Sequence, residues 1–214
     1  MATQYIRIDS LKVEKMGAMT KQPPTRAIVW RLNIKAKKKK LDLEYSGAYE
    51  HVFGAGEDIA AFIMSLAQQP DANKGSLPKE PVPGHSKSNL SIRFDQYAYI
   101  VILLEDGNWK FSAGAEPFQV EQGNAAYYTN PLCAWVDSAG AHTGKTPPPD
   151  SCRVACFAAD AAEDKANSDD PLDFSTGFNI YLDLALERKD NPNITRLLSI
   201  VVDPDVGHPG GNEL

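Results

Sequence analysis

The chain has 214 residues, a formal net charge of −6 and a composition ordinary for a globular protein. This length suits one β-sandwich or barrel, so we expect a single domain over residues 1–214 whose core needs neither disulfides nor metal. The negative charge opposes nucleic acid and anionic membranes, and we therefore predict neither as a partner.

The N-terminal residues lack the apolar segment of a signal peptide, because charges recur at Arg7, Asp9 and Lys12. The longest apolar run, residues 98–104, suits a buried strand and is too short to span a bilayer. The three cysteines are an odd number, which favours free thiols over a disulfide framework. Together these features predict a soluble, cytoplasmic protein.

The first half of the chain contains alternating apolar residues that predict strands over residues 5–13 and 28–34. A basic turn at residues 37–40 leads into a strand over residues 41–45, so we expect a hairpin there. Residues 57–69 form the one predicted helix, because their apolar residues have the spacing of one helical face. We expect this helix to cap one end of the fold.

The middle of the chain reads as short strands separated by turns, which is typical of an antiparallel sandwich or barrel. Residues 97–104 are apolar on both faces, as expected of a strand inside a core. Long loops are predicted at 70–88, 138–151 and the acidic 158–173. The other strands are predicted over residues 90–94, 109–111, 118–121, 125–129, 132–136 and 153–157.

The strongest pattern is a hairpin over residues 174–202, in which apolar residues occupy every second position from 178 to 186. This is the period of a strand with one buried face, and Leu198, Ile200 and Val202 repeat it on the second strand. We therefore predict an all-β fold. It is an antiparallel two-sheet β-sandwich of jelly-roll or Greek-key type, with roughly eight to ten strands, one short helix and long loops.

The polar side of this hairpin is a candidate ligand site. Asn179, Tyr181 and Asp183 alternate with the apolar residues, and such side chains can line a concave sheet that binds sugar or another polar ligand. The alternative is that they form the solvated side of an antiparallel sheet.

Residues 139–146, AGAHTGKT, resemble a P-loop with alanine in place of the first glycine. Gly144, Lys145 and Thr146 are therefore candidate nucleotide-binding residues. A P-loop leads into a helix whose N-terminus faces the phosphate, and three prolines at 147–149 oppose that helix. Nucleotide binding is the second alternative function.

Asp203, Asp205 and His208 are candidate metal ligands near the end of the sequence. Carboxylates suit calcium or magnesium, and an added histidine suits zinc or manganese, but no spacing here is diagnostic. The two aspartates can also be turn formers beside Pro204. The first alternative function is thus a hydrolase that uses a divalent metal, which is the one cofactor we consider.

The cysteines give no catalytic arrangement. Cys152 and Cys156 would leave the same face of a strand about 13 Å apart, which excludes a mutual disulfide and a shared metal. The histidines fall in predicted loops, so the sequence places no base beside a thiol. We therefore predict a non-catalytic binding or assembly module. Its small-molecule ligand is not identified by the sequence, and it self-associates through a sheet face or edge.

Overall fold

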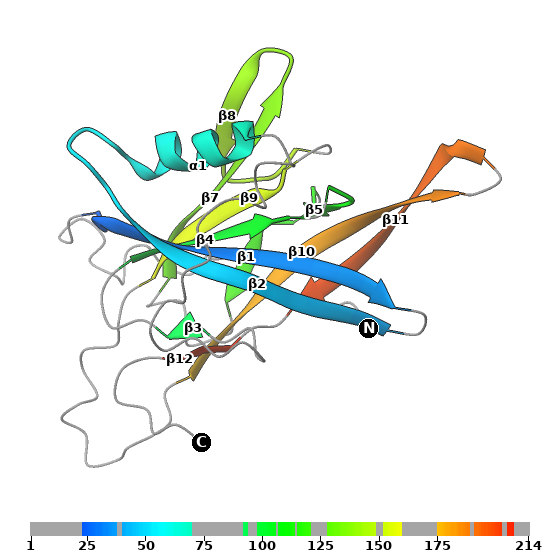
Figure 1. The fold of residues 1–214 in the computed structure, drawn as a ribbon, viewed down its shortest axis with the longest axis horizontal. Coiled ribbons are helices and arrows are strands. Elements are labelled where there is room, and N and C mark those ends of the chain that lie inside the picture. The colour runs from blue at the N-terminus through cyan, green and yellow to red at the C-terminus, as the bar shows by residue number, and fades with distance from the viewer. Residues whose placement is uncertain are drawn as a thin grey trace.

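The structure is a computed structural model that describes residues 23–37, 40–69, 92–93, 98–105, 107–113, 115–120, 128–148, 152–159, 175–188, 191–202 and 205–207. These segments form twelve strands and one helix (Figure 1). The strand predicted over residues 5–13, the loop at 70–88 and most of the acidic loop at 158–173 lie outside them. Among the described residues, no helix has the length and apolar character that crossing a membrane requires.

The first sheet has six strands in the order β2-β1-β4-β9-β7-β8. Their bounds are β1 (Arg26–Lys37), β2 (Lys40–Val52), β4 (Ala98–Leu104), β7 (Tyr128–Asp137), β8 (Gly140–Gly144) and β9 (Val154–Ala159). β1 and β2 form the predicted hairpin, with Lys37 paired to Lys40 at its tip.

β1 and β4 run parallel, so the prediction of antiparallel pairing throughout is wrong. Two parallel strands must be joined by a crossover connection. Here the chain between them contains β2 and the helix α1 (Ile59–Gln68), followed by residues 69–97. The remaining described pairs of this sheet are antiparallel.

The second sheet is organised on the long strand β10. Its strands are β3 (Ile92–Arg93), β5 (Trp109–Phe111), β6 (Phe118–Val120), β10 (Ser175–Arg188), β11 (Asn191–Val202) and β12 (Asp205–Gly207). β11 and β12 pair with β10 in one continuous register along the same edge, with Val202 opposite Ile180 and Asp205 opposite Gly177. β6 and β5 pair with the other edge of β10. β10 and β11 confirm the predicted hairpin, and β3 pairs with β12 in parallel.

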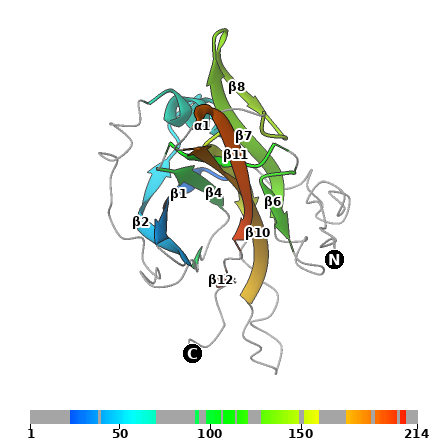
Figure 2. The same ribbon diagram turned by 90° about the vertical axis from the view of Figure 1, so that its right-hand side faces the viewer.

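The main apolar core contains side chains from both sheets. Trp30 and Phe157 enter it from the first sheet, and Trp109 and Ile180 enter it from the second. Figure 2 shows β10 and β11 in front of the first sheet, in agreement with this shared core. The apolar face of β10 thus packs against the core, as the alternation of apolar and polar residues along the strand predicts.

The opposite face of the first sheet is covered by α1 (Figures 1 and 2). Phe62, Ile63 and Leu66 of α1 join Val29 and Val101 in a second apolar cluster. The helix therefore covers a sheet face instead of the end we expected. β4 is buried along its whole length between the two clusters, which confirms the prediction of a doubly buried strand for residues 98–104.

Strand β8 lies within residues 138–151, where the sequence predicts a loop. It pairs with β7 from Cys133–Gly144 to Asp137–Gly140, which leaves a tight turn at residues 138–139. Gly140 has a φ of 127°, a conformation that glycine adopts without a steric cost. Likewise, β7 is one strand where two were predicted, and its register with β9 shifts between Thr129 and Leu132.

Candidate functional site

The polar face of β10 brings together side chains from several strands. Asn179, Tyr181 and Asp183 lie on the face opposite the main core, since Ile180 and Leu182 between them point into it. The three predicted ligand-binding residues therefore share one face, as the alternation predicts.

The neighbouring strands add three polar residues to this face. Gln119 of β6 lies opposite Asn179, Lys110 of β5 lies opposite Asp183, and Ser199 of β11 lies opposite Asp183 on the other side. Directly opposite residues of antiparallel strands have Cβ atoms about 4.5–5.5 Å apart. We refer to these six residues as the β10 polar face.

Three residues of the β10 polar face are buried, whereas Lys110 and Asn179 are partly exposed and Ser199 is exposed. The exposed fraction is 4% for Gln119 and 6% for both Tyr181 and Asp183. The alternative of a solvated sheet side is therefore wrong for Tyr181 and Asp183. Polar groups buried to this degree are normally hydrogen-bonded, because an unpaired group loses its interaction with water.

Asp183 has a hydrogen-bond partner among the described residues, whereas Gln119 Oε1 has none. Asp183 Oδ1 accepts a hydrogen bond from Ser199 Oγ at 2.6 Å, and Lys110 supplies a cation on the strand opposite. A carboxylate has about four acceptor positions, so this bond leaves capacity for further donors. Gln119 Oε1, by contrast, has no hydrogen-bond partner among the described residues.

Tyr181 lies where the edge of β10 passes from β5 to β6. The connection between these strands keeps the backbone bonded: Ser112 N donates to Tyr181 O at 3.0 Å, and Tyr181 N donates to Pro117 O at 3.4 Å. The tyrosine is therefore held between the Gln119 pair and the Asp183 pair on the same face.

The outer edge of the second sheet is formed by β11, which pairs with β10 alone among the described strands. Leu198 and Val201 are 43% and 46% exposed there. The last six residues of the strand, LLSIVV, contain no charge and no proline. Figure 1 shows the β10–β11 hairpin projecting from the other strands on the right.

The predicted nucleotide segment has a different geometry from a P-loop. Gly144 is the last residue of β8, and Lys145 and Thr146 follow it without entering a helix. A Cβ added at Gly144 would lie 2.9 Å from Cη2 of Trp135, so the glycine makes room for the indole. This packing explains the glycine without a phosphate.

The tip of the β7–β8 hairpin holds an internal network. Asp137 Oδ1 lies 2.8 Å from His142 Nε2 and accepts a hydrogen bond from Ala139 N at 2.7 Å. The His142 contact and the Ala139 bond hold the pKa of Asp137 below its ordinary value. The His142 ring also stacks on Trp135, with ring centroids 5.8 Å apart. These contacts stabilise the turn.

The predicted metal cluster lies outside what the structure describes. Asp203 and His208 are not described, and Asp205 is placed only as a residue of β12, paired with Gly177 of β10. Within the described ranges, no three histidine, cysteine or acidic residues come together to hold a metal ion.

The three cysteines are free thiols inside the core. Cys152 lies in the main core with Cys133, and Cys156 lies in the cluster under α1, so Cys152 and Cys156 do not share a face as expected. The reason is that β9 begins only at Val154. A hydrogen bond to Cys133 and burial raise the pKa of the Cys152 thiol, and burial raises that of Cys156, which disfavours the nucleophilic thiolate.

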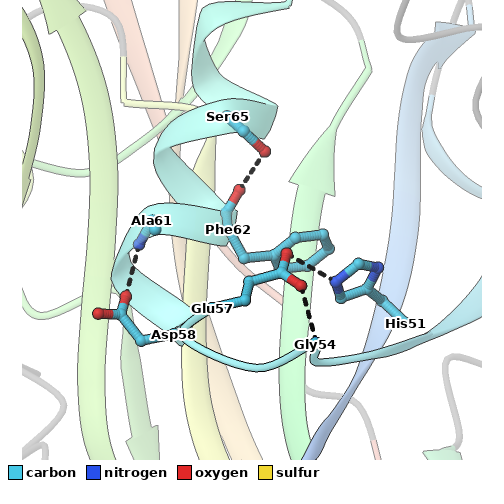
Figure 3. Close-up of polar contacts among 7 residues, drawn as sticks. All are labelled: His51, Gly54, Glu57, Asp58, Ala61, Phe62 and Ser65. Carbon is cyan, nitrogen blue, oxygen red and sulfur yellow. Dashed lines mark hydrogen bonds and ion pairs between the residues drawn. The ribbon is translucent and has the colours of Figure 1, made fainter.

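The corner between β2 and α1 is a second polar network (Figure 3). Glu57 lies 2.9 Å from His51 Nε2 through Oε1 and accepts the Gly54 N–H at 3.1 Å through Oε2. The Gly54 bond, with a smaller contribution from His51, holds the pKa of Glu57 below its ordinary value. Because Asp58 also caps α1, with Oδ1 2.7 Å from Ala61 N, the corner fixes the start of the helix.

His51 is held in this corner by packing as well. Its ring stacks on Phe62 with centroids 4.1 Å apart, and Phe53 meets both rings edge-on. The imidazole is thus fixed by an aromatic stack and one carboxylate, an arrangement that orients the helix on the sheet.

A comparison of the chain with protein-family models found no match, and a comparison with curated proteins found none either. The β10 polar face and the edge strand β11 are the features of this chain that suggest a function.

Proposed function

We propose that the protein is a non-catalytic assembly module whose copies associate by pairing their β11 edge strands. The observation that carries this proposal is the exposed, uncharged edge of β11 at Leu198 and Val201. A free edge presents unpaired N–H and C=O groups and pairs readily with another strand. Natural edges are usually blocked by charges or proline, and LLSIVV contains neither.

The occupant of this edge is a second copy of the chain. Two identical edges can pair antiparallel about a two-fold axis, and such an interface closes as a dimer. The net charge of −6 makes copies repel over most surfaces, and an uncharged edge avoids that repulsion. Exposed Leu198 and Val201 would lose water contact in such a pair, which adds hydrophobic stabilisation to the backbone bonds.

Molar mass in solution tests this proposal. Light scattering at micromolar concentration should give the wild type twice the chain mass of 23.4 kDa, and Leu198→Lys should give the chain mass. Val136→Lys is the matched control, because Val136 is 39% exposed but belongs to β7, which lies inside the first sheet. A monomeric wild type, or equal masses for the two lysine variants, would contradict the proposal.

A second candidate function is polar-ligand binding at Asn179, Tyr181 and Asp183. It is supported by the buried Gln119, Tyr181 and Asp183. It is compatible with assembly because strand pairing would use the outward backbone groups of β11, whereas the β10 polar face consists of side chains on one face of the sheet. We also propose that the fold is a two-sheet sandwich of jelly-roll or Greek-key type, supported by the core that both sheets share. A cytoplasmic location is part of the same proposal, supported by the free thiols.

A further inference from the structure

The side-chain oxygen of Gln119 is a buried hydrogen-bond acceptor without a donor among the described residues. Gln119 is more than nine-tenths buried, and its Oε1 has no hydrogen-bond partner in the described part of the chain. Phe118 beside it enters the main core, so Gln119 points to the β10 polar face. Buried acceptors of folded proteins are ordinarily matched by a donor from protein, water or ligand.

The groups around this acceptor fit one size of ligand. Asn179 lies directly opposite Gln119, and Tyr181 follows two residues along β10, at about 6.6 Å for a rise of 3.3 Å per residue. Asp183 lies the same distance beyond Tyr181 and is held by Ser199. The group of Gln119, Asn179 and Tyr181 therefore spans about the width of one sugar ring, with a carboxylate at its far end.

The charges of the face indicate a neutral ligand. Asp183 and Lys110 are directly opposite residues of β10 and β5, so the formal charges of this pair sum to zero. Gln119 and Asn179 contribute carboxamides, which both donate and accept hydrogen bonds, and Tyr181 adds a hydroxyl and an apolar ring. Adjacent hydroxyl groups on an otherwise apolar ring match this combination.

We infer that the β10 polar face binds a neutral polyhydroxylated ligand of monosaccharide size, which donates a hydroxyl hydrogen bond to Gln119 Oε1. Gln119 is thus the specificity-determining acceptor of the site, and Asn179 and Tyr181 contact the same ligand. Macromolecular ligands are disfavoured because the acceptor is enclosed. This inference rests on the second candidate function above and names its ligand class and its principal acceptor.

Ligand-observed NMR with glucose, galactose, mannose and glycerol tests the inference on the full chain. At least one hexose should receive saturation from the wild type, and Gln119→Met should weaken its binding about tenfold, the loss expected for one hydrogen bond. Asn179→Ala should weaken binding as well, which keeps the test informative if Gln119→Met fails to fold.

Two variants distinguish a failure of the assembly proposal from a failure of the ligand inference. Leu198→Lys should lose the dimer and keep sugar binding, because Leu198 lies opposite Leu184 and not on the polar side of the sheet. Gln119→Met should keep the dimer and bind sugar about tenfold more weakly. No saturation transfer to any of the four compounds would overturn the inference. Unchanged affinity in Gln119→Met would also overturn it.

Discussion

Truncation of Ile63 to alanine tests how α1 packs on the first sheet. Ile63 is fully buried in the cluster that also contains Val29 and Val101. Removing three carbons from such a site costs about 2–5 kcal/mol, because the transfer energy is lost and a cavity remains. For a chain of this length each kcal/mol lowers the melting temperature by about 2–4 °C, so the expected loss is roughly 4–20 °C.

Urea unfolding followed by far-ultraviolet circular dichroism measures this cost. Ile63→Val should lose about 0.5–1.5 kcal/mol and thus fall between the wild type and Ile63→Ala. The matched control is Ser65→Ala on the exposed side of the same helix, which removes only a hydroxyl bonded to Phe62 O at 2.7 Å. If Ile63→Ala and Ser65→Ala have the same unfolding midpoint, α1 does not pack on the sheet as described.

Three further predictions concern the polar corner and the β7–β8 hairpin. Asp58→Ala should destabilise by about 1 kcal/mol in the same assay, because Ala61 N loses its cap, while Asp58→Asn keeps the acceptor and most of the stability. Gly144→Ala should cost about 1–3 kcal/mol, because the new methyl group meets Trp135, and an unchanged midpoint would show that this contact is not tight. Glu57 has a lowered pKa when folded, so its contribution is present above the ordinary carboxyl pKa of about 4.3 and is lost as pH falls through the folded pKa. Wild type and Glu57→Gln should therefore differ in stability near neutral pH and converge in acid, and a difference that persists at low pH would contradict the assignment.

Local patterns in the sequence predict the strands that have one or two buried faces. Ile180, Leu182 and Leu184 enter the core of the structure as their spacing indicates. The period of β10 also places Asn179 and Asp183 on the opposite face. The apolar residues of β4 and the helical spacing in α1 are equally local, and both elements form where they are predicted.

Pairing between distant segments is the part that local patterns do not predict. Gln119 joins the candidate site only because β6 pairs with β10, some sixty residues away along the chain. The parallel pairing of β1 with β4 depends on a long crossover connection in the same way. The edge position of β11 is also a property of the whole sheet, so its exposed Leu198 reads in the sequence as a core residue.

Strand β8 was missed for a different reason. Its sequence, GAHTG, begins and ends with glycine and contains little apolar surface, so it resembles a turn. The signals that identify it are non-local. They are the Trp135 ring over Gly144 and the contact between Asp137 and His142, and both require the hairpin to be formed first.

The most direct test of assembly through β11 is amide hydrogen exchange of residues 197–202 at protein concentrations below and above dimer formation. Alternate amides of an edge strand point away from β10, so a second copy would protect them by accepting their hydrogen bonds. We predict that their exchange slows as concentration rises and that Leu198→Lys abolishes this dependence. Exchange rates that are the same at both concentrations would contradict pairing through β11.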